Sequence, residues 1–335
     1  MKKAFLFFTL MGIILSSCAP QSESQSPKIP IIVDDDGSMD GVVAMLYFLA
    51  HPDYDVIALT SSYGIGRPAI FAEHLSRLLA QVKQRNVSVA AGSELPLAGS
   101  NAFPDDWRDF SDRFFGFPLP AKREPVSTLS APELMVELIN ASPEPVAVFV
   151  SGAHTSLAQA LRIDGGIKDN IRWVGVMGGA LFVKGNIAGD AASLGYTNET
   201  AEWNIWVDTL AASEVFSSGL PIYLTALDAT NQVTWDSEFS RRWEDSKDPA
   251  ARLAGEMVTR MNGSGASAYV WDLTAALFVA HPDLCKSETF RVEVVTNPGP
   301  DEGRTVAVQD PNGSVIACLN PDVPDFHAKA EEVFR

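Results

Sequence analysis

The chain of 335 residues is 46% hydrophobic and 20% charged, which supports a sizeable core and excludes a disordered or fibrous protein. Its 42 acidic residues outnumber 25 basic ones, for a formal net charge of −17. Nucleic acids bind Lys- and Arg-rich faces, so this balance argues against a nucleic-acid partner and favours a hard cation or a neutral polar substrate. Three cysteines exclude a disulfide scaffold and a Cys-cluster zinc site.

Residues 1–17 have the pattern of a signal peptide. Lys2 and Lys3 precede a 12-residue apolar run that is too short to span a membrane as a helix. The run ends in Leu15-Ser16-Ser17-Cys18, which resembles a bacterial lipobox and implies cleavage before Cys18 and a lipid on its thiol. A plain signal peptide with an incidental cysteine is the alternative. Polar residues 18–27 would tether the domain, and we expect a periplasm-facing lipoprotein of the bacterial cell envelope, in the outer membrane.

From residue 28 onward, short apolar runs alternate with segments of helical period. Strands are predicted at 29–33, 56–61, 87–91, 146–150, 171–177 and 222–227, and helices at 39–50, 70–83, 132–141, 155–162 and 209–218. The strand runs are continuously apolar, which is typical of strands buried on both faces of a parallel sheet. The sequence therefore predicts one α/β domain over residues 28–335, with a mostly parallel, Rossmann-like sheet and helices on both faces.

Polar residues follow four of these strands. In such a sheet the working residues lie just beyond the carboxyl ends of the strands, so we expect the functional site there. The segments concerned are Asp34-Asp35-Asp36-Gly37-Ser38-Met39-Asp40, Ser151-Gly152, Met177-Gly178-Gly179 and Asp228.

The acidic segment after the first strand is a candidate cation site. Asp34, Asp36 and Asp40 are spaced so that a strand end and the first turn of the next helix converge. Crowded carboxylates repel unless a cation holds them or one stays protonated, and oxygen-only ligands suit Ca²⁺ or Mg²⁺ rather than Zn²⁺. Helix capping is the alternative, and it accounts for one aspartate better than for four within seven positions.

Other patterns argue against competing chemistries. Residues 63–69 resemble part of a dinucleotide-binding fingerprint, but Ala69 replaces its third glycine and the segment is not the first strand–helix turn. Walker A, Gly-x-Ser-x-Gly and His-x-x-x-His patterns do not occur in the sequence. Of five histidines only His154 lies beside a strand end, where a loop or core role is the simpler interpretation.

Two tryptophans are candidates for stacking a flat ligand. Trp107 lies in residues 101–108, which are predicted to form a polar, proline-broken loop. Trp271 precedes Asp272 at the start of a helix-like segment. An aromatic ring outside the core suits a stacking role, whereas Trp203 and Trp206 are expected to pack partly in the core.

Together, five segments in order resemble the calcium-dependent nucleoside hydrolases over nearly the whole domain. Residues 34–40 look like the family's Asp-x-Asp-x-x-x-Asp-Asp cluster, and residues 151–156 look like its Thr-Gly-Pro-Leu-Thr-Asn turn. Residues 177–186 and 201–204 are similar to its ribose-binding segment, and residues 269–272 to its late metal-ligand motif. The resemblance implies that a metal-activated water hydrolyses the N-glycosidic bond of a nucleoside to free base and ribose.

The resemblance is strongest to the purine-specific (inosine–adenosine–guanosine) branch. In the broad-specificity branch a histidine precedes the late aspartate and protonates the departing base, and this chain has Trp271 there. The purine branch has a tryptophan at that position and a second one in a loop similar to Asn-x-Phe-Pro-x-x-Trp, which corresponds to Trp107. The resemblance thus implies that Trp107 and Trp271 sandwich a purine nucleoside's base.

The resemblance also assigns roles to the remaining residues, with Asp36 as the general base on a water bound to Ca²⁺. It implies that the metal is held by Asp36, Asp272 and the backbone carbonyl of Ser151, with Asp34 in support. It implies that Asp40, Asn204 and Asp272 bind the 2′- and 3′-hydroxyls of the ribose. Asn186 and Glu202 would bind the 5′-hydroxyl, and Met177 would lie against the lower face of the sugar. Two alternatives stay open. Asn204 and Glu202 could cap a helix, and Asn198 could take the place of Asn186.

Gly41 departs from the family, which has a calcium-ligating aspartate at this position. The resemblance therefore implies a weakened calcium site, and we expect Gly41→Asp to tighten calcium binding. A nucleoside- or ribose-binding lipoprotein without turnover is the competing hypothesis. The sequence leaves open whether Cys285 and Cys318 pair and whether the chain forms a homo-oligomer.

Overall fold

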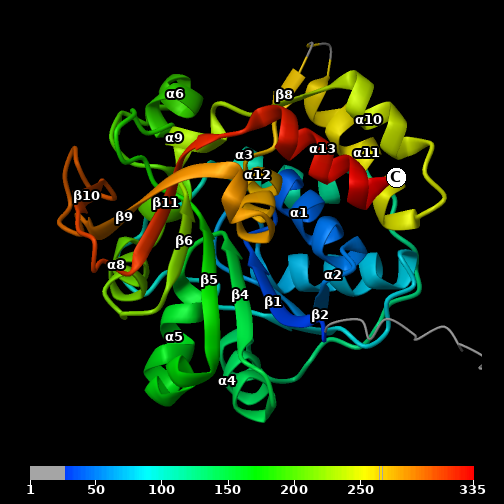
Figure 1. Ribbon diagram of the computed structural model, residues 1–335, viewed down its shortest axis with the longest axis horizontal. Helices are drawn as coiled ribbons and strands as arrows, with labels where there is room; N and C mark the ends of the chain where they lie inside the picture. The colour runs from blue at the N-terminus through cyan, green and yellow to red at the C-terminus, as the bar shows by residue number, and fades with distance from the viewer. Residues whose placement is uncertain (1–26, 264, 266) are drawn as a thin grey trace, which may run out of the picture.

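The computed structural model describes residues 27–263, 265 and 267–335 (Figure 1). The predicted signal peptide, Cys18 with its predicted lipid, and the predicted tether up to residue 26 lie outside these residues. The strands are β1 (Ile29–Asp35), β2 (Tyr54–Ser61), β3 (Ser88–Ala91), β4 (Val146–Ser151), β5 (Ile171–Met177), β6 (Ile222–Thr225), β7 (Thr234–Asp236), β8 (Ser267–Tyr269), β9 (Cys285–Val294), β10 (Thr305–Gln309) and β11 (Val315–Pro321).

Helices alternate with these strands through most of the chain. The α-helices are α1 (Met39–Ala50), α2 (Pro68–Gln81), α3 (Asp105–Asp112), α4 (Ala131–Ala141), α5 (Thr155–Ile163), α6 (Ile187–Ala191), α7 (Trp203–Trp206), α8 (Thr209–Phe216), α9 (Leu227–Thr230), α10 (Ser237–Glu244), α11 (Pro249–Asn262), α12 (Trp271–Ala280) and α13 (Val323–Phe334). Short 3₁₀ helices span Phe114–Gly116, Gly165–Asn170, Ala192–Leu194 and Pro282–Leu284.

Within the described residues, nine strands form one sheet in the order β10-β9-β11-β6-β5-β4-β1-β2-β3, and β7 pairs separately with β8. From β11 to β3 all neighbouring strands are parallel, whereas β9 and β10 are antiparallel. The predicted mostly parallel α/β sheet is confirmed. The register places Asp35 opposite both Ser61 and Ser151, so the carboxyl ends of β1, β2 and β4 meet at one edge.

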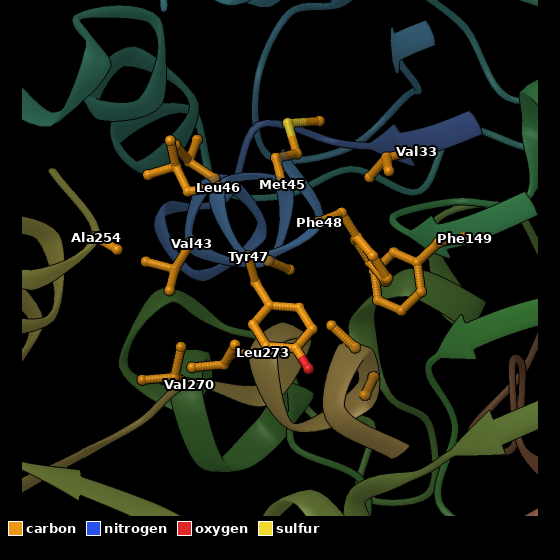
Figure 2. Close-up of a cluster of buried hydrophobic side chains, with 14 of the residues drawn as sticks. Val33, Val43, Met45, Leu46, Tyr47, Phe48, Phe149, Ala254, Val270 and Leu273 are labelled. Carbon is orange, nitrogen blue, oxygen red and sulfur yellow. The ribbon is translucent and has the colours of Figure 1, made fainter. Parts of the chain in front are cut away.

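Apolar layers cover both faces of the sheet. On one face α1, α11 and α12 pack over strand residues that include Val33 and Phe149, and Figure 2 shows this layer around Tyr47 and Phe48 of α1. On the other face α4, α5 and α8 cover alternate strand residues such as Ile32. Successive side chains of a strand point to opposite faces, which explains why the central strands carry runs of consecutive apolar residues, such as residues 146–150 of β4.

An antiparallel edge, β9 and β10, was not predicted. It lies at one end of the sheet in Figure 1. Phe290 and Val292 of β9 are buried while Arg291 and Glu293 between and beyond them are exposed, so this strand lacks the continuous apolar run of the central strands. Cys285 and Cys318 form a disulfide between β9 and β11, with their Cα atoms 5.7 Å apart.

Several predicted boundaries differ from the structure for local reasons. Helix α2 begins at Pro68 rather than at residue 70, because proline suits the first helical turn, where its missing N–H is not needed. Strand β6 ends at Thr225, since Leu227 already starts α9. Trp107 lies on helix α3 and not in a loop, because the acidic first turn after Pro104 favours a helix start.

None of the helices described is long and apolar enough to cross a membrane.

Candidate active site

A cavity of about 430 Å³ lies beside the carboxyl ends of β1, β4 and β5. Its lining includes every residue that the sequence assigned to catalysis, substrate or metal except Asp34, namely Asp36, Asp40, Trp107, Ser151, Met177, Asn186, Glu202, Asn204, Trp271 and Asp272. It also includes residues to which the sequence gave no such role: Ser38, Ile65, Phe103, Asp190 and Trp203. The fold thus brings together segments that are distant in the chain.

Asp36 directly follows β1 and is only 2% exposed. Its Oδ2 accepts a hydrogen bond from the backbone N–H of Ile65 (3.1 Å), while its Oδ1 has no partner among the described residues. A Cβ on Gly152 would lie 2.6 Å from the Cβ of Asp36, so the strand ends approach this closely only with glycine there. Burial, and then the charge of Asp35, raise the pKa of Asp36 well above its usual value.

Asp40 and Asp272 lie in the first turns of α1 and α12. The backbone N–H of Asp272 donates to Oδ2 of Asp40 (3.3 Å). Ser38 links the two helix starts, since its hydroxyl donates to Oδ2 of Asp272 (2.9 Å) and accepts from the N–H of Gly41 (2.8 Å). Burial raises the pKa of both carboxyls, and the charge of Asp40 raises that of Asp272 further. The two acids therefore repel each other when both are ionised.

Asp34 and Asp35 are neighbours on β1 and point to opposite faces of the sheet. Asp34 accepts a hydrogen bond from Oγ1 of Thr60 (2.6 Å) and does not line the cavity. The supporting role predicted for Asp34 therefore involves no direct contact with a ligand in the cavity. Asp35 accepts hydrogen bonds from the N–H of Gly37 (2.8 Å) and the hydroxyl of Ser151 (2.7 Å). Burial raises the pKa of Asp34 to about 7 and that of Asp35 to about 8.

Gly41 faces the carboxylate of Asp35, which leaves no room for a side chain at position 41. A Cβ there would lie 2.6 Å from Oδ1 of Asp35 and nearer still to its Cγ and Oδ2. Relief would require this buried carboxylate to leave its two hydrogen bonds, at a cost in stability. An aspartate at position 41 would thus have to displace Asp35, and the expected effect of Gly41→Asp on calcium binding stays a prediction.

Glu202 and Asn204 hold the turn beneath the cavity. Glu202 caps α7, and its two carboxylate oxygens accept hydrogen bonds from three backbone N–H groups at 2.9–3.3 Å. The amide of Asn204 donates to the carbonyl oxygens of Met177 (3.1 Å) and Ser151 (3.4 Å). Glu202 is thus a helix cap that also lines the cavity, and burial raises its pKa to about 7.

Of the two asparagines considered for the 5′-hydroxyl, Asn186 lines the cavity and Asn198 does not. Oδ1 of Asn186 is buried and has no hydrogen-bond partner in the described part of the chain. Asn198 instead binds backbone groups of its own loop and the carbonyl of Glu302. Asp190, which accepts a hydrogen bond from Nε1 of Trp203 (3.2 Å), was missed because it lies where the chain is longer than the family pattern.

Trp271 forms one aromatic wall of the cavity. Its ring lies nearly parallel to that of Tyr269, with centroids 5.7 Å apart and an angle of 14° between the planes. Its Nε1 donates to Oδ1 of Asn231 (3.0 Å). The indole is therefore held in a fixed orientation by two contacts.

Trp107 belongs to a second aromatic group that lines the cavity. It packs against Trp203, with ring centroids 5.6 Å apart, and Trp203 stacks on Phe103 at 4.6 Å. Trp203 and Phe103 were missed as lining residues, although each lies within a segment on which the family resemblance rests. Both are mostly buried, so they extend the core up to the cavity wall.

Among the described residues that line the cavity, none is a histidine. His154 is fully buried beside Phe216, at 5.6 Å between ring centroids, and burial lowers its pKa to about 4. It is a core residue, in line with the simpler interpretation of the sequence.

The donor set has the chemistry of a hard-cation site. Over residues 27–335, apart from 264 and 266, no three acidic, histidine or cysteine side chains already stand in a metal-binding arrangement. The candidate donors are nevertheless all oxygens, and Oδ1 of Asp36 is buried with no hydrogen-bond partner in the same described part. Buried carboxylates that raise one another's pKa need protons or a cation, so these residues fit calcium.

Comparison with known proteins adds the family. A sequence profile described as inosine-uridine preferring nucleoside hydrolase matches residues 31–328. The pyrimidine-specific ribonucleoside hydrolase RihA of Citrobacter koseri is 30% identical over 233 residues, which are 69% of this chain and 70% of that protein. Two solved structures share the fold. A plant nucleoside hydrolase aligns with a TM-score of 0.78 and 23% identity over 92% of this chain and 99% of that one. A purine-preferring ribonucleoside hydrolase from Gardnerella vaginalis aligns with a TM-score of 0.78 and 22% identity over 91% of this chain and 98% of that one.

Proposed function

The chain belongs to the inosine-uridine preferring nucleoside hydrolase family, and we propose that it hydrolyses purine ribonucleosides to free base and ribose. The observation that carries the purine preference is that Trp107 and Trp271 line the same cavity as the carboxylates. Two aromatic faces suit a flat, fused-ring base. None of the described residues that line the cavity is a histidine that could protonate the departing base. We propose that the base takes its proton from solvent and that stacking on the two tryptophans stabilises this protonated base.

The cleavage step falls to Asp36. Its Oδ1, which has no hydrogen-bond partner among the described residues, would accept the proton of the attacking water. The water oxygen bonds to the anomeric carbon of the ribose, and the bond from that carbon to the base nitrogen breaks with its electron pair going to the base. Calcium held by Asp36, Asp272 and the carbonyl of Ser151 would lower the pKa of that water.

The other polar residues of the cavity would hold the sugar. Asp40, Asp272 and Asn204 are proposed to bind the 2′- and 3′-hydroxyls, and Asn186 and Glu202 the 5′-hydroxyl. Met177 would lie under the ribose ring. These roles agree with a cavity whose polar groups come from the ends of β1 and β4 and from the starts of α1, α6, α7 and α12.

Base specificity is tested by kcat/KM for inosine, guanosine, uridine and cytidine. The proposal expects both purine nucleosides to be preferred. RihA, a 30% identical relative, is pyrimidine-specific, so pyrimidine hydrolysis is the competing outcome with a specific observation behind it. A preference for uridine or cytidine would overturn the purine part and leave nucleoside hydrolysis intact.

Binding without turnover is the second candidate function. Gly41 favours it, since it removes a carboxylate that the family resemblance places at the metal, whereas Asp36 and Asp272 in the cavity oppose it. Incubation with inosine and calcium, followed by an assay for reducing sugar, separates the two. Ribose release by the wild type but not by Asp36→Asn supports hydrolysis, and inosine binding with no release supports the binding protein.

We also propose that the chain is a lipoprotein anchored through Cys18 and facing the periplasm. The disulfide between Cys285 and Cys318 supports an oxidising compartment, because cytosolic thiols are kept reduced.

A further inference from the structure

Asp35 occupies the space in which a side chain at position 41 would stand. The side chains of β1 alternate, so Asp35 points to the same face as Ile31 and Val33, the face that α1 covers. The three atoms nearest to a Cβ built on Gly41 are all in the carboxylate of Asp35, the farthest of them, Oδ1, at 2.6 Å. The strand thus places a carboxylate where the family resemblance expects one from the helix.

Asp35 is fully buried without a cationic partner. Its exposure is 0%, and its hydrogen bonds come from a backbone N–H and the hydroxyl of Ser151. None of the ion pairs among the described residues involves Asp35, Asp36, Asp40 or Asp272. An ionised carboxylate buried in this way costs free energy unless it is paired or binds a metal.

Two neighbours connect Asp35 to the cavity. Ser151, whose hydroxyl donates to Asp35, lies opposite it in the β1–β4 register and lines the cavity. Asp36, the next residue along the chain, has an oxygen, Oδ1, that is buried and unpartnered within the described residues. Buried polar atoms normally have partners, so an unpartnered carboxylate oxygen inside an acidic cluster indicates a cation that completes the site.

We propose that Asp35 is a ligand of the cation site and that it supplies from β1 the carboxylate that the family supplies from the start of α1. This role rests on the calcium-assisted hydrolysis proposed above. Calcium affinity depends on the number of charged ligands, and Asp35 restores the charge that Gly41 removes. Glycine at position 41 is required for this arrangement, because any side chain there would overlap the carboxylate of Asp35. The ligand has then moved from position 41 on α1 to position 35 on β1.

The test measures calcium binding by calorimetry on the full chain, together with thermal unfolding in calcium and in EDTA. Asp35→Asn keeps the shape of the side chain and removes its charge, so calcium affinity should fall by at least about tenfold. Asp208→Asn is the matched control. Asp208 is also fully buried and accepts a hydrogen bond from Thr155 (2.6 Å), but none of its hydrogen-bond donors lines the cavity, whereas Ser151, which donates to Asp35, does. Calcium affinity should therefore not change in this variant.

The exchange itself is tested by combining two substitutions. Gly41→Asp alone should lower the melting temperature in EDTA, because its Cβ meets the carboxylate of Asp35. Adding Asp35→Ala removes that carboxylate. The Asp35→Ala/Gly41→Asp variant should therefore unfold at a higher temperature than Gly41→Asp and bind calcium more tightly than Asp35→Ala, a non-additivity typical of residues in contact.

Asp36→Asn separates this inference from the proposed function. If the wild type binds calcium, Asp36→Asn loses it and Asp35→Asn keeps it, Asp35 only fills space and the inference is overturned while the hydrolase stands. An exchange variant that binds calcium no better than Asp35→Ala also overturns it. A wild type that binds no calcium overturns both the calcium-assisted mechanism and the role of Asp35.

Discussion

Trp271→Ala tests the aromatic wall on which the proposed purine preference depends. The indole is half-buried, lies nearly parallel to Tyr269 at 5.7 Å and donates to Asn231, so it is oriented before any ligand arrives. Stacking of a base on an aromatic side chain contributes about 1–3 kcal/mol. Since about 1.4 kcal/mol corresponds to a factor of ten, loss of this wall should lower kcat/KM for inosine by about 5- to 140-fold.

The assay follows release of free base from inosine and from uridine, with thermal unfolding to confirm that each variant is folded. Trp271→Phe is the matched variant, because it keeps an aromatic face and loses only the hydrogen bond to Asn231, and it should recover most of the activity. A purine offers a larger face than a pyrimidine, so the loss in Trp271→Ala should be greater for inosine. Unchanged kcat/KM for inosine, or equal losses in the two variants, would refute stacking on Trp271.

Asp36→Asn should lower kcat by about 10²- to 10⁴-fold with unchanged circular dichroism, because it removes the positioned base, and a loss below about tenfold contradicts that role. In EDTA the melting temperature should fall from about pH 4 to pH 8. Burial raises the pKa of Asp34 and Glu202 to about 7 and that of Asp35 to about 8, above the values in the unfolded chain. Over this interval the folded protein keeps protons that the unfolded chain has lost, so the free energy of unfolding decreases as pH rises. A melting temperature that rises over this interval would be inconsistent with these shifts. Cys18→Ser should move the protein from the membrane fraction to the soluble periplasmic fraction, and an unchanged distribution on fractionation counts against the lipid anchor.

The parallel half of the sheet was predictable because burial on both faces leaves a clear mark in the sequence. β5 was predicted with its observed bounds, 171–177, and so was α1, 39–50, which Ser38 caps at its start. The C-terminal strands were not predicted. β9 has few buried residues, and they alternate with exposed ones in its second half. Its partners in β10 and β11 lie 11 to 36 positions away in the chain, so a continuous apolar run does not mark this strand.

Most residues of the cavity lie in segments that carry the family resemblance, whereas Ile65 and Asp190 lie outside them and were not predicted. The relation between Asp35 and Gly41 was not predicted either. The two residues are six positions apart, and only the packing of α1 against β1 makes the carboxylate of one exclude a side chain on the other. Considered position by position, Gly41 is a lost ligand, whereas the packing of the two elements indicates an exchange.

A purely structural role for Asp35 is a poor explanation of its place in the fold. A small neutral residue could share the space beside Gly41 without the free-energy cost of a buried carboxyl group, whose pKa is raised to about 8 by burial. The hydroxyl of Ser151 and the N–H of Gly37 offset part of that cost, but neither supplies a positive charge. A cation would offset the charges of Asp35, Asp36 and Asp272 together, because each ion pair formed in a buried site is weakly screened by solvent. The presence of an ionisable group in this buried space is therefore best explained by its use when the cation binds.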